Sequence, residues 1–326
     1  MIISRTPLRI SFCGGGTDVQ DYWENYEGAV ISTSIDKYIY IIVKERYDNE
    51  IWLKYSENEI VYDVNDIKHT RWRECLKKVG IDKGIEIVCL SEVPKGTGLG
   101  GSSAFTIGTL NALYALKGIS KSSSELAKEA CEIEIEVLKE PIGKQDQYAS
   151  SHGGFNLIEF KKDRDVIINP IILSPEIKKR LCSNLLLFNT KVTRDAKEIL
   201  CEQNKKNNIE SKKEMLHKMK EFAYSAKDAL HSSDLRRFGE LLHENWEYKK
   251  KMACNLSNSK IDYYYDLAIK AGAIGGKICG AGGGGFLLFY AEPEKQESGR
   301  DVLKDLKELE FNFESFGSKI IYIGEK

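Results

Sequence analysis

Alternating apolar and polar residues predict a strand-rich first third of the chain. Residues 2–12 alternate in this way, and residues 29–46 include a run of β-branched and aromatic side chains. Residues 50–63 are typical of a hairpin, and residues 85–90 of a further strand that ends before Pro94. We therefore expect a sheet in this region, with glycine-rich turns after the first and last of these strands.

Helical spacing of apolar residues characterises the segments that follow. Residues 102–116 carry apolar side chains at three- and four-residue intervals. Ser122 offers N-cap chemistry for a second helix, which we expect to continue through about residue 138. Pro141 ends that helix, and residues 155–160 form the next predicted strand.

The second half is dominated by charged helical patterns between short strands. We predict strands at 184–189, 275–279, 286–290 and 319–323, and helices at 194–253, 261–271 and 293–309. Because helices and strands occur in mixed order within each half, we expect two α+β lobes rather than regular βαβ winding. The boundary should lie between residues 160 and 184, and we assign residues 1–170 to the first domain and 171–326 to the second.

Length and charge narrow the class of protein. With 326 residues the chain is long enough for two lobes, because single cores rarely grow past roughly 250–300 residues. Its 48 Lys and Arg residues balance 49 Asp and Glu residues, so the net charge of -1 provides no field that attracts nucleic acid. The basic run at 249–251 is interpreted as a solvated helix face.

The cysteines and the N-terminal residues indicate the cellular compartment of the protein. The eight cysteines are scattered without a C-x-x-C pair, which is typical of a reduced, intracellular protein without a structural zinc site. The N-terminus lacks the apolar core of a signal peptide, and no apolar run approaches the ~20 residues that a membrane helix needs. We expect a cytoplasmic protein that binds neither nucleic acid nor a membrane.

The strongest local signal is the glycine-rich segment Pro94–Ala104, which follows a predicted strand and opens a predicted helix. Glycines let backbone N–H groups approach a ligand closely, and the start of a helix favours an anion. The hydroxyls of Ser102 and Ser103 lie where they could meet a phosphate oxygen or its Mg²⁺. The glycine spacing fits neither a Walker A loop nor a Rossmann fingerprint, which disfavours a dehydrogenase. A tight turn with a serine cap is the alternative interpretation.

Two further glycine clusters flank other predicted strands. Residues 14–16 are glycines that place Thr17 and Asp18 on a turn, where a carboxylate can accept hydrogen bonds from sugar hydroxyls. An ordinary turn capped by Asp18 is the alternative. Residues 275–285 contain seven glycines in eleven positions, which predicts a close backbone approach to a ligand or to another loop.

Carboxylates near the middle of the chain are candidates for phosphoryl transfer. Glu132, Glu134 and Glu136 precede a segment that contains Lys144 and Asp146. Phosphoryl transfer needs Mg²⁺ ligands, a charge clamp and a group that orients or accepts the hydroxyl proton. A helical glutamate and Asp146 could fill these roles, although two of the three glutamates are expected on a charged helix surface. Lys144 is either a charge clamp or simply the ion-pair partner of Asp146.

Together and in this order, the segments resemble the motifs of the GHMP kinases, the family of galactokinase, homoserine kinase, mevalonate kinase and phosphomevalonate kinase. The resemblance covers nearly the whole chain and is carried by residues 5–18, 94–104 and 277–285. Within the family, residues 143–148 and 243–249 also look similar to bacterial D-glycero-D-manno-heptose 7-phosphate kinases and to fucokinase-type enzymes. For His243 itself, packing within a helix is preferred to a part in catalysis.

The resemblance implies two α+β lobes, the first like the second domain of ribosomal protein S5 and the second ferredoxin-like. ATP would lie against residues 94–104, with the sugar between the lobes. Asp146 matches the catalytic aspartate, and Arg9 matches an arginine that keeps this aspartate ionised. A nearby guanidinium favours the charged form of a carboxyl group. Asp18 matches the sugar-binding aspartate, and Lys144 or Arg9 would offset charge.

The resemblance also implies ligands for ATP, Mg²⁺ and substrate. Ser102 and Glu134 match the Mg²⁺ ligands, with Ser103 in reserve and Glu136 favoured by the mevalonate kinase spacing. The ATP-binding residues would be Pro94, Gly96, Thr97, Gly98, Leu99, Gly100, Gly101, Ser102, Ser103 and Ala104. The substrate-binding residues would be Gly15, Gly16, Thr17, Asp18, Arg194, Gly282 and Gly283.

The expected reaction is in-line transfer of the ATP γ-phosphoryl group to the anomeric hydroxyl of D-glycero-D-manno-heptose 7-phosphate. A substrate with a 7-phosphate needs a cationic partner, and Arg5, Lys95 and Arg194 are candidates that the sequence does not rank. Alternatives are a fucokinase- or galactokinase-like acceptor, or a nucleotide- or sugar-binding protein without catalysis. The expected partner is a small molecule, and a homodimer is compatible with the sequence.

Overall fold

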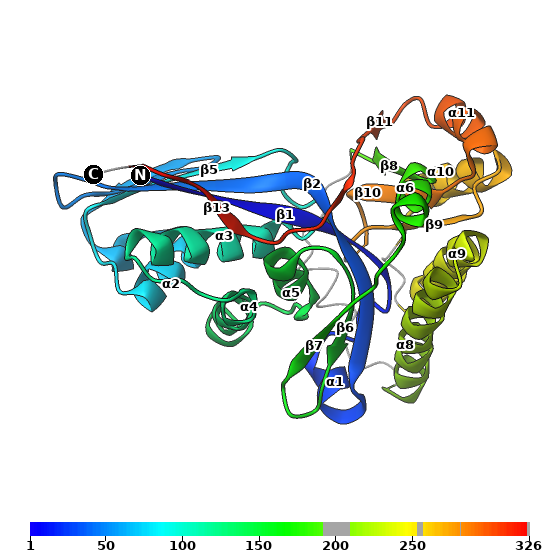
Figure 1. Cartoon of the computed structure of the whole chain (residues 1–326), viewed down its shortest axis with the longest axis horizontal. Helices are drawn as coiled ribbons and strands as arrows, with labels where there is room; N and C mark the ends of the chain where they lie inside the picture. The colour runs from blue at the N-terminus through cyan, green and yellow to red at the C-terminus, as the bar shows by residue number, and fades with distance from the viewer. Residues whose placement is uncertain (192–208, 253–256, 281, 325–326) are drawn as a thin grey trace.

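The long strand β2 organises the larger of two sheets in the computed structural model, which describes residues 1–191, 209–252, 257–280 and 282–324 (Figure 1). Its first residues pair with β6 and its last residues with β5, while β1 runs antiparallel along most of its length. The nine strands of this sheet are β1 (Ile2–Cys13), β2 (Gly28–Glu45), β3 (Ile51–Lys54), β4 (Asn58–Val61), β5 (Ile85–Ser91), β6 (Phe155–Phe160), β7 (Val166–Pro170), β12 (Phe313–Glu314) and β13 (Lys319–Ile323).

Helices cover one face of this sheet (Figure 1). Alternate residues of the strands, such as Leu8, Ile41 and Ile87, are fully buried and share one core with Ile107 and Leu110 of helix α3. The elements of this layer are α2 (Thr70–Val79), α3 (Gly101–Leu116), α4 (Ser123–Cys131), a π-helical turn η2 (Glu132–Val137) and α5 (Gln145–His152). The short α1 (Gln20–Tyr26) follows β1, and a 3-10 turn η1 (Val64–Asp66) precedes α2.

The second sheet has four strands in the order β11-β8-β10-β9. Every residue of β9 and β10 is buried, so neither strand alternates between buried and exposed positions, and β9 carries the buried Lys277. The strands are β8 (Leu185–Asn189), β9 (Gly275–Ile278), β10 (Phe286–Tyr290) and β11 (Lys307–Glu308). The helices of this half are α6 (Pro175–Ser183), α8 (Ile209–His231), α9 (Leu235–Met252), α10 (Ser259–Lys270) and α11 (Pro293–Val302). None of the helices in the described ranges could cross a membrane.

Contacts between the halves gather at the end of β1. The rings of Phe12 and Phe238 meet edge to face with centroids 5.2 Å apart. The buried Lys277 ammonium donates to the Ser11 and Phe12 carbonyls at 2.6 and 2.9 Å. The chain also returns to the first sheet at its end, where β13 pairs with β1 and β12 with β2. The boundary at residues 170 and 171 stays a prediction.

The predicted elements and the observed ones differ where packing overrides the local pattern. The prediction of a helix over 293–309 is wrong at its C-terminal end, because α11 ends at Val302 and residues 307–308 pair with β8. The second predicted helix changes to π geometry at Glu132. The sequence reasoning missed α1, α2, α5, α6, β7 and β12. Part of the predicted helical stretch 194–253 lies outside the described residues.

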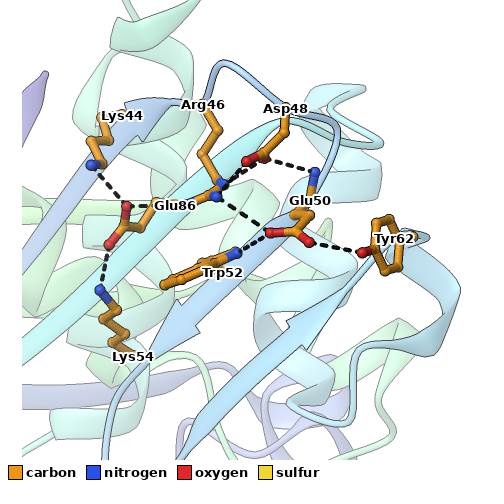
Figure 2. A network of polar contacts seen from close by, with 8 residues as sticks. All are labelled: Lys44, Arg46, Asp48, Glu50, Trp52, Lys54, Tyr62 and Glu86. Atoms are coloured by element: carbon orange, nitrogen blue, oxygen red, sulfur yellow. Dashed lines mark hydrogen bonds and ion pairs between the residues drawn. The ribbon is translucent and has the colours of Figure 1, made fainter.

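A polar network covers the outer face of β2, β5 and β3 (Figure 2). Glu86 accepts a hydrogen bond from Lys54 at 2.6 Å and lies 2.9 Å from the Lys44 ammonium, and both lysines are on neighbouring strands. The guanidinium of Arg46 stacks over the Trp52 ring, 4.1 Å from its centroid. The hydrogen bonds from Lys54 and Lys44 lower the pKa of Glu86 below its ordinary value.

We predict that Glu86→Gln lowers the free energy of unfolding by about 1 kcal/mol at pH 7, because two ion pairs with half-exposed lysines are lost. The folded pKa of Glu86 is depressed, so its contribution is present above pH 4.5 and disappears as the pH falls through the folded pKa. Urea unfolding at neutral and acidic pH measures this, with the exposed Glu310→Gln as control. A difference from wild type that grows toward acid would contradict the network's role.

Candidate active site

Arg9 joins the glycine-rich loop to the candidate catalytic carboxylate. Its Nε and Nη2 donate to Oδ1 and Oδ2 of Asp146, each at 2.7 Å, and its Nη1 donates to the Gly98 carbonyl at 2.7 Å. Arg9 lies on β1 and is 3% exposed, while the Asp146 side chain, in the first turn of α5, keeps 24% of its surface exposed. The forked guanidinium therefore holds a partly accessible carboxylate beside the loop at residues 94–104.

Asp18 lies in the same cluster. Its Oδ1 accepts from the Gly16 N–H at 2.9 Å and its Oδ2 from the Gln145 N–H at 3.4 Å. A side chain at Gly143 would overlap the Asp18 carboxylate, so this glycine allows the turn before α5 to close on Asp18. Burial first, and then the nearby Asp146 carboxylate, raise the pKa of Asp18. The two carboxyl groups that the sequence separates by more than a hundred residues are thus electrostatic neighbours.

The loop before α3 has the backbone pattern of an anion-binding nest. Gly96, Gly98 and Gly100 all have positive φ, at 75°, 79° and 76°. Gly100 is the N-cap of α3 and no side chain caps the helix, so the N–H groups of the first turn have no intrahelical or capping partner. Alternation of left-handed residues and a free helix N-terminus are the features that hold phosphate groups.

The third glycine cluster packs directly against this loop. A Cβ on Gly98 would stand 2.4 Å from the Cys279 carbonyl oxygen, and one on Gly280 would stand 2.5 Å from the Gly98 Cα. Farther along, a Cβ on Gly285 would stand 2.4 Å from the Thr97 oxygen. The expected close backbone approach is confirmed, and the partner is the loop at residues 94–104.

Glu134 is the buried carboxylate of the site. It is 0% exposed, and its Oε2 accepts from Ser103 Oγ at 2.8 Å and Gln147 Nε2 at 2.5 Å. Its Oε1 accepts from Thr106 Oγ1 at 2.6 Å and Arg71 Nε at 3.2 Å. Of the two glutamates that family spacings allow, the structure brings Glu134 to the loop, whereas Glu136 is exposed.

Ser103, rather than Ser102, contacts Glu134, whereas the assignment of Ser102 as the Mg²⁺ ligand stays a prediction. Helix α3 starts at Gly101, so Ser103 and Thr106 are three residues apart and share its buried face. Ser102 is exposed. The π-helical turn η2 adds one residue to its helical turn and presents Glu134 inward, as π-bulges do at functional sites.

Lys144 does not meet the Asp146 carboxylate. Its ammonium lies 3.9 Å from the centroid of the Trp23 ring and donates to the Arg164 carbonyl at 3.4 Å. Burial lowers the pKa of Lys144. The structure gives Lys144 a packing role beside α1, so Arg9 is the cation that offsets charge at Asp146.

The three cations that the sequence offered for a substrate phosphate have different outcomes. Arg5 lies over the Tyr38 ring and 3.7 Å from Glu314, on the outer face of the sheet. Lys95 is exposed on the loop. Arg194 falls outside the described residues. Only Lys95 therefore remains among the three candidates as a residue seen near the loop.

The remaining candidates divide between backbone and packing roles. The Thr17 hydroxyl is fully buried and donates to the Gly14 carbonyl at 2.8 Å and accepts from the Ala29 N–H at 3.0 Å, so it stabilises the turn. Leu99 and Ala104 are buried in the core. Gly15 and Gly16 line the turn beside Asp18 and Gln145, Pro94 is exposed, Gly101 begins α3, and Gly282 and Gly283 lie in the β9–β10 connection.

Sequence reasoning missed polar residues on the buried face of α9. Asn245 accepts a hydrogen bond from the Gly14 N–H at 3.4 Å, and Lys249 donates to the Gly280 carbonyl at 2.8 Å. Lys249 is 8% exposed, so the interpretation of residues 249–251 as a solvated face is wrong for this residue. The spacing of Leu242, Trp246 and Lys249 places them on one face of a helix, and this was the available signal. His243 packs against Tyr265 through a 2.8 Å hydrogen bond, which agrees with the packing interpretation.

Comparisons with known proteins agree with this arrangement. The model of the GHMP kinases N terminal domain matches residues 67–154, and that of the GHMP kinases C terminal matches residues 226–308. A D-glycero-alpha-D-manno-heptose 7-phosphate kinase of Campylobacter jejuni is 34% identical over 90% of this chain and 91% of its own. An L-fucokinase/L-fucose-1-P guanylyltransferase of Bacteroides fragilis is 27% identical over 94% of this chain and 36% of its own. The crystal structure of a D-glycero-D-manno-heptose 1-phosphate kinase from Bacteriodes thetaiotaomicron superposes with a TM-score of 0.83 and 27% identity, covering 100% of both chains.

The chain therefore belongs to the GHMP kinase family and has its two-domain fold. More particularly, it is an ATP-dependent phosphotransferase of the sugar kinase type. The fold and class expected from the three glycine-rich segments are confirmed.

We predict that Gly98→Ala and Gly96→Ala have different effects, although both residues have positive φ. Alanine at 96 has open space around its Cβ, so it should cost only the left-handed strain of about 1–2 kcal/mol. Alanine at 98 collides with the Cys279 carbonyl and should cost clearly more, about 3 kcal/mol. Denaturant unfolding measures both. Equal losses would contradict the tight packing of the loop on residues 279 and 280.

Proposed function

We propose that the enzyme transfers the γ-phosphoryl group of ATP to the anomeric hydroxyl of D-glycero-D-manno-heptose 7-phosphate, which gives the 1,7-bisphosphate. The observation that carries the proposal is the single guanidinium of Arg9, which holds both the Asp146 carboxylate and the Gly98 carbonyl of the loop. The heptose acceptor is supported by the 34% identity to the Campylobacter jejuni heptose 7-phosphate kinase. The class of reaction rests on the family, and the choice of sugar rests on this relative.

The loop and the start of α3 would bind the phosphates of ATP. Positive φ at Gly96, Gly98 and Gly100 turns backbone N–H groups toward one side, and the helix dipole favours an anion at Gly101. Leu99 in the middle of the segment and Ala104 at its end are buried in the core, so the N–H groups between them are fixed before the nucleotide arrives. Fixed dipoles of this kind stabilise charge without reorganising during the reaction.

Mg²⁺ would be held by Ser103 and Glu134. Their oxygens Oγ and Oε2 lie 2.8 Å apart, close to the separation of about 3.0 Å between neighbouring ligands of an octahedral Mg²⁺ ion at about 2.1 Å from the metal. The ion would supply positive charge between the phosphate groups. Thr106, Gln147 and Arg71 hold the Glu134 carboxylate in place through its remaining hydrogen bonds.

Asp146 would orient the sugar hydroxyl and receive its proton as the oxygen attacks phosphorus. Both of its oxygens already accept from Arg9, which fixes the plane of the carboxylate, and its remaining exposure leaves lone pairs open to a ligand. Asp18, on the neighbouring glycine turn, would accept hydrogen bonds from sugar hydroxyls. The carboxylate pair then specifies a polyol acceptor, while positioning supplies much of the acceleration.

We predict that Asp146→Asn lowers kcat by about 100-fold or more, because the amide keeps the shape of the side chain but cannot take the hydroxyl proton. ATP affinity should change little, since the loop is intact. Coupled measurement of ADP release and calorimetric titration with ATP provide the two readouts. The exposed Asp82→Asn is the matched control and should behave as wild type. Near-normal turnover of Asp146→Asn would remove Asp146 from the mechanism.

A panel of acceptors tests the choice of sugar. Wild type should release ADP with a higher kcat/KM for D-glycero-D-manno-heptose 7-phosphate than for L-fucose, D-galactose or the unphosphorylated heptose. A preference for fucose or galactose would keep the kinase and change the acceptor to one of the alternatives. Absence of ADP release with every sugar, with ATP binding retained, would favour a binding protein without catalysis.

We predict that Ser103→Ala raises the Mg²⁺ concentration needed for half-maximal activity by about tenfold or more, whereas Ser102→Ala changes it little. The reason is that Ser103, and not its exposed neighbour, contacts the Glu134 carboxylate. Magnesium titrations at saturating ATP and sugar measure the effect. A larger effect at Ser102 would restore the ligand expected from the motif count.

A further inference from the structure

Lys249 is a buried cation whose only hydrogen-bond acceptor among the described residues is a neutral carbonyl. Its ammonium carries three N–H donors, and one of them bonds to the Gly280 oxygen at 2.8 Å. The residue is 8% exposed and forms no ion pair with any described carboxylate. Burying an unpaired charge costs free energy, so a cation in this state calls for an anionic partner that the protein itself does not provide.

The position of Lys249 connects it to the proposed site by direct contacts. Gly280, which accepts its hydrogen bond, packs against Gly98, and the Gly98 carbonyl accepts from Arg9, which holds Asp146. Each of these steps is a hydrogen bond or a backbone contact. The Lys249 ammonium therefore reaches the loop from helix α9, in the second half of the chain.

Other buried polar atoms near the glycine turn at residues 14–16 also lack hydrogen-bond partners among the described residues. Asn245 is four residues before Lys249, so both lie on one face of α9. Its Oδ1 accepts from the Gly14 N–H, but its Nδ2 has no hydrogen-bond partner among the described residues, and Asn245 is 0% exposed. The Ser11 hydroxyl, about 4.0 Å from the Cβ position of Gly15, is likewise buried and unpartnered. Unused donors at this place indicate room for a ligand with acceptor oxygens.

Charge at this place favours an anion. Burial first, and then the nearby Lys277 and Arg9 cations, lower the pKa of Lys249 to about 7, against the opposing effects of Asp18 and Cys279. Lys277 is itself buried, with its hydrogen bonds used on the carbonyls of residues 11 and 12. Lys277 thus contributes charge without an available donor for a ligand, and Lys249 contributes both.

We propose that Lys249 contacts a phosphate group in the substrate complex and is the cation that the sequence candidates Arg5, Lys95 and Arg194 were expected to supply. The proposal rests on the proposed function for the identity of the ligands. Two phosphates could be the source: the γ-phosphate of ATP, and the phosphate of a phosphorylated sugar. Either phosphate would give the buried ammonium an anionic partner. In the first case the affinity for ATP depends on Lys249, and in the second the affinity for the sugar phosphate does.

The experiment compares Lys249→Met, Lys249→Arg and wild type, with the exposed Lys251→Met of the same helix as control. Calorimetric titrations use the non-hydrolysable ATP analogue AMP-PNP with Mg²⁺, D-glycero-D-manno-heptose 7-phosphate, and the unphosphorylated heptose. We expect Lys249→Met to weaken binding of AMP-PNP or of the sugar phosphate by about tenfold or more, as loss of a buried charged contact does. Binding of the unphosphorylated heptose should not change in either case.

Which affinity falls identifies the source of the phosphate. Loss for AMP-PNP alone assigns Lys249 to the γ-phosphate, and kcat should then fall with every acceptor. Loss for the sugar phosphate alone assigns it to the acceptor, and the KM of the phosphorylated sugar should rise while that of the unphosphorylated one stays. Affinities within twofold of wild type for both ligands would overturn the proposal.

Stability separates this role from a structural one. If Lys249 served only to link α9 to Gly280, Lys249→Met would lower Tm and leave both affinities unchanged, which would overturn the proposal. If Lys249 instead binds a phosphate ligand, Lys249→Met removes an unpaired buried charge and should leave Tm equal or higher. Lys249→Arg keeps a cation and should retain part of the affinity.

The pH dependence gives a second readout that does not need the methionine variant to fold. Because the ammonium must be protonated to bind an anion, wild-type affinity for the phosphate ligand should fall as the pH rises from 7 to 9. Phosphate monoesters are already fully charged in this range, with a second pKa of about 6. Lys249→Arg stays protonated and should show a flat profile. An identical pH profile in wild type and Lys249→Arg would overturn the proposal.

These measurements stand apart from the test of the proposed function. The protein could bind AMP-PNP in a way that depends on Lys249 and yet phosphorylate no sugar. That result would support the inference and contradict the proposed reaction. Normal heptose phosphorylation by Lys249→Met, with unchanged affinities, would remove the inference and leave the reaction.

Discussion

The guanidinium of Arg9 is the interaction on which the geometry of the site depends. It is planar, and three of its N–H groups are directed at two targets: both oxygens of Asp146 and the carbonyl of Gly98. A point charge on a flexible stem could hold either target, but it would not set the angle between them. A Cβ on Gly100 would stand 3.0 Å from Cγ of Arg9, so the absence of a side chain at this position leaves room for the arginine. The arginine, the loop and the start of α5 therefore take up their positions together.

Backbone packing, rather than flexibility, explains several of the glycines in the three clusters. Gly14 lies against the Ala29 carbonyl, Gly98 against the backbone at 279 and 280, and Gly285 against Thr97. Each contact is shorter than any side chain would allow, so the segments pack backbone to backbone. Such contacts bring the N–H groups of the loop and the carbonyl groups of the β9–β10 connection into one place. The dense packing also fixes the loop before a nucleotide binds, which reduces the entropy lost on binding.

Buried charges in the site are only partly paired with opposite charges. Two carboxylates, Asp18 and Asp146, lie near one another, and the pKa of Asp18 is raised as a result of burial and this proximity. Around them are Arg9, Lys277 and Lys249, all buried, and only Arg9 has a carboxylate partner among the described residues. Buried cations without counterions reduce the stability of the free protein and are compensated when anions bind. The site is thus prepared for negatively charged substrates.

Local patterns in the sequence were sufficient for the class of the protein. Alternation identified the long strands, helical spacing identified α3, and three glycine-rich segments in order identified the family, because each depends on residues close together in the chain. Short elements such as α5 and β7 were missed, since a few residues carry too little periodicity to outweigh packing. Counting along the loop suggested Ser102, but helix α3 begins at Gly101 and its phase brings Ser103 to Glu134.

Only the tertiary structure determined which residues distant in the sequence contact one another. Helical spacing places Lys249, unlike Lys250 and Lys251, on the face of Leu242 and Trp246, but only the folded chain shows that this face is buried and that Lys249 contacts Gly280. Lys144 adjoins Asp146 in sequence, yet its side chain extends toward Trp23, while Arg9, from the opposite end of the domain, holds the carboxylate. Local sequence determines the conformation of a segment. The burial of a charge and the partner it finds depend on segments that come together only in the folded chain.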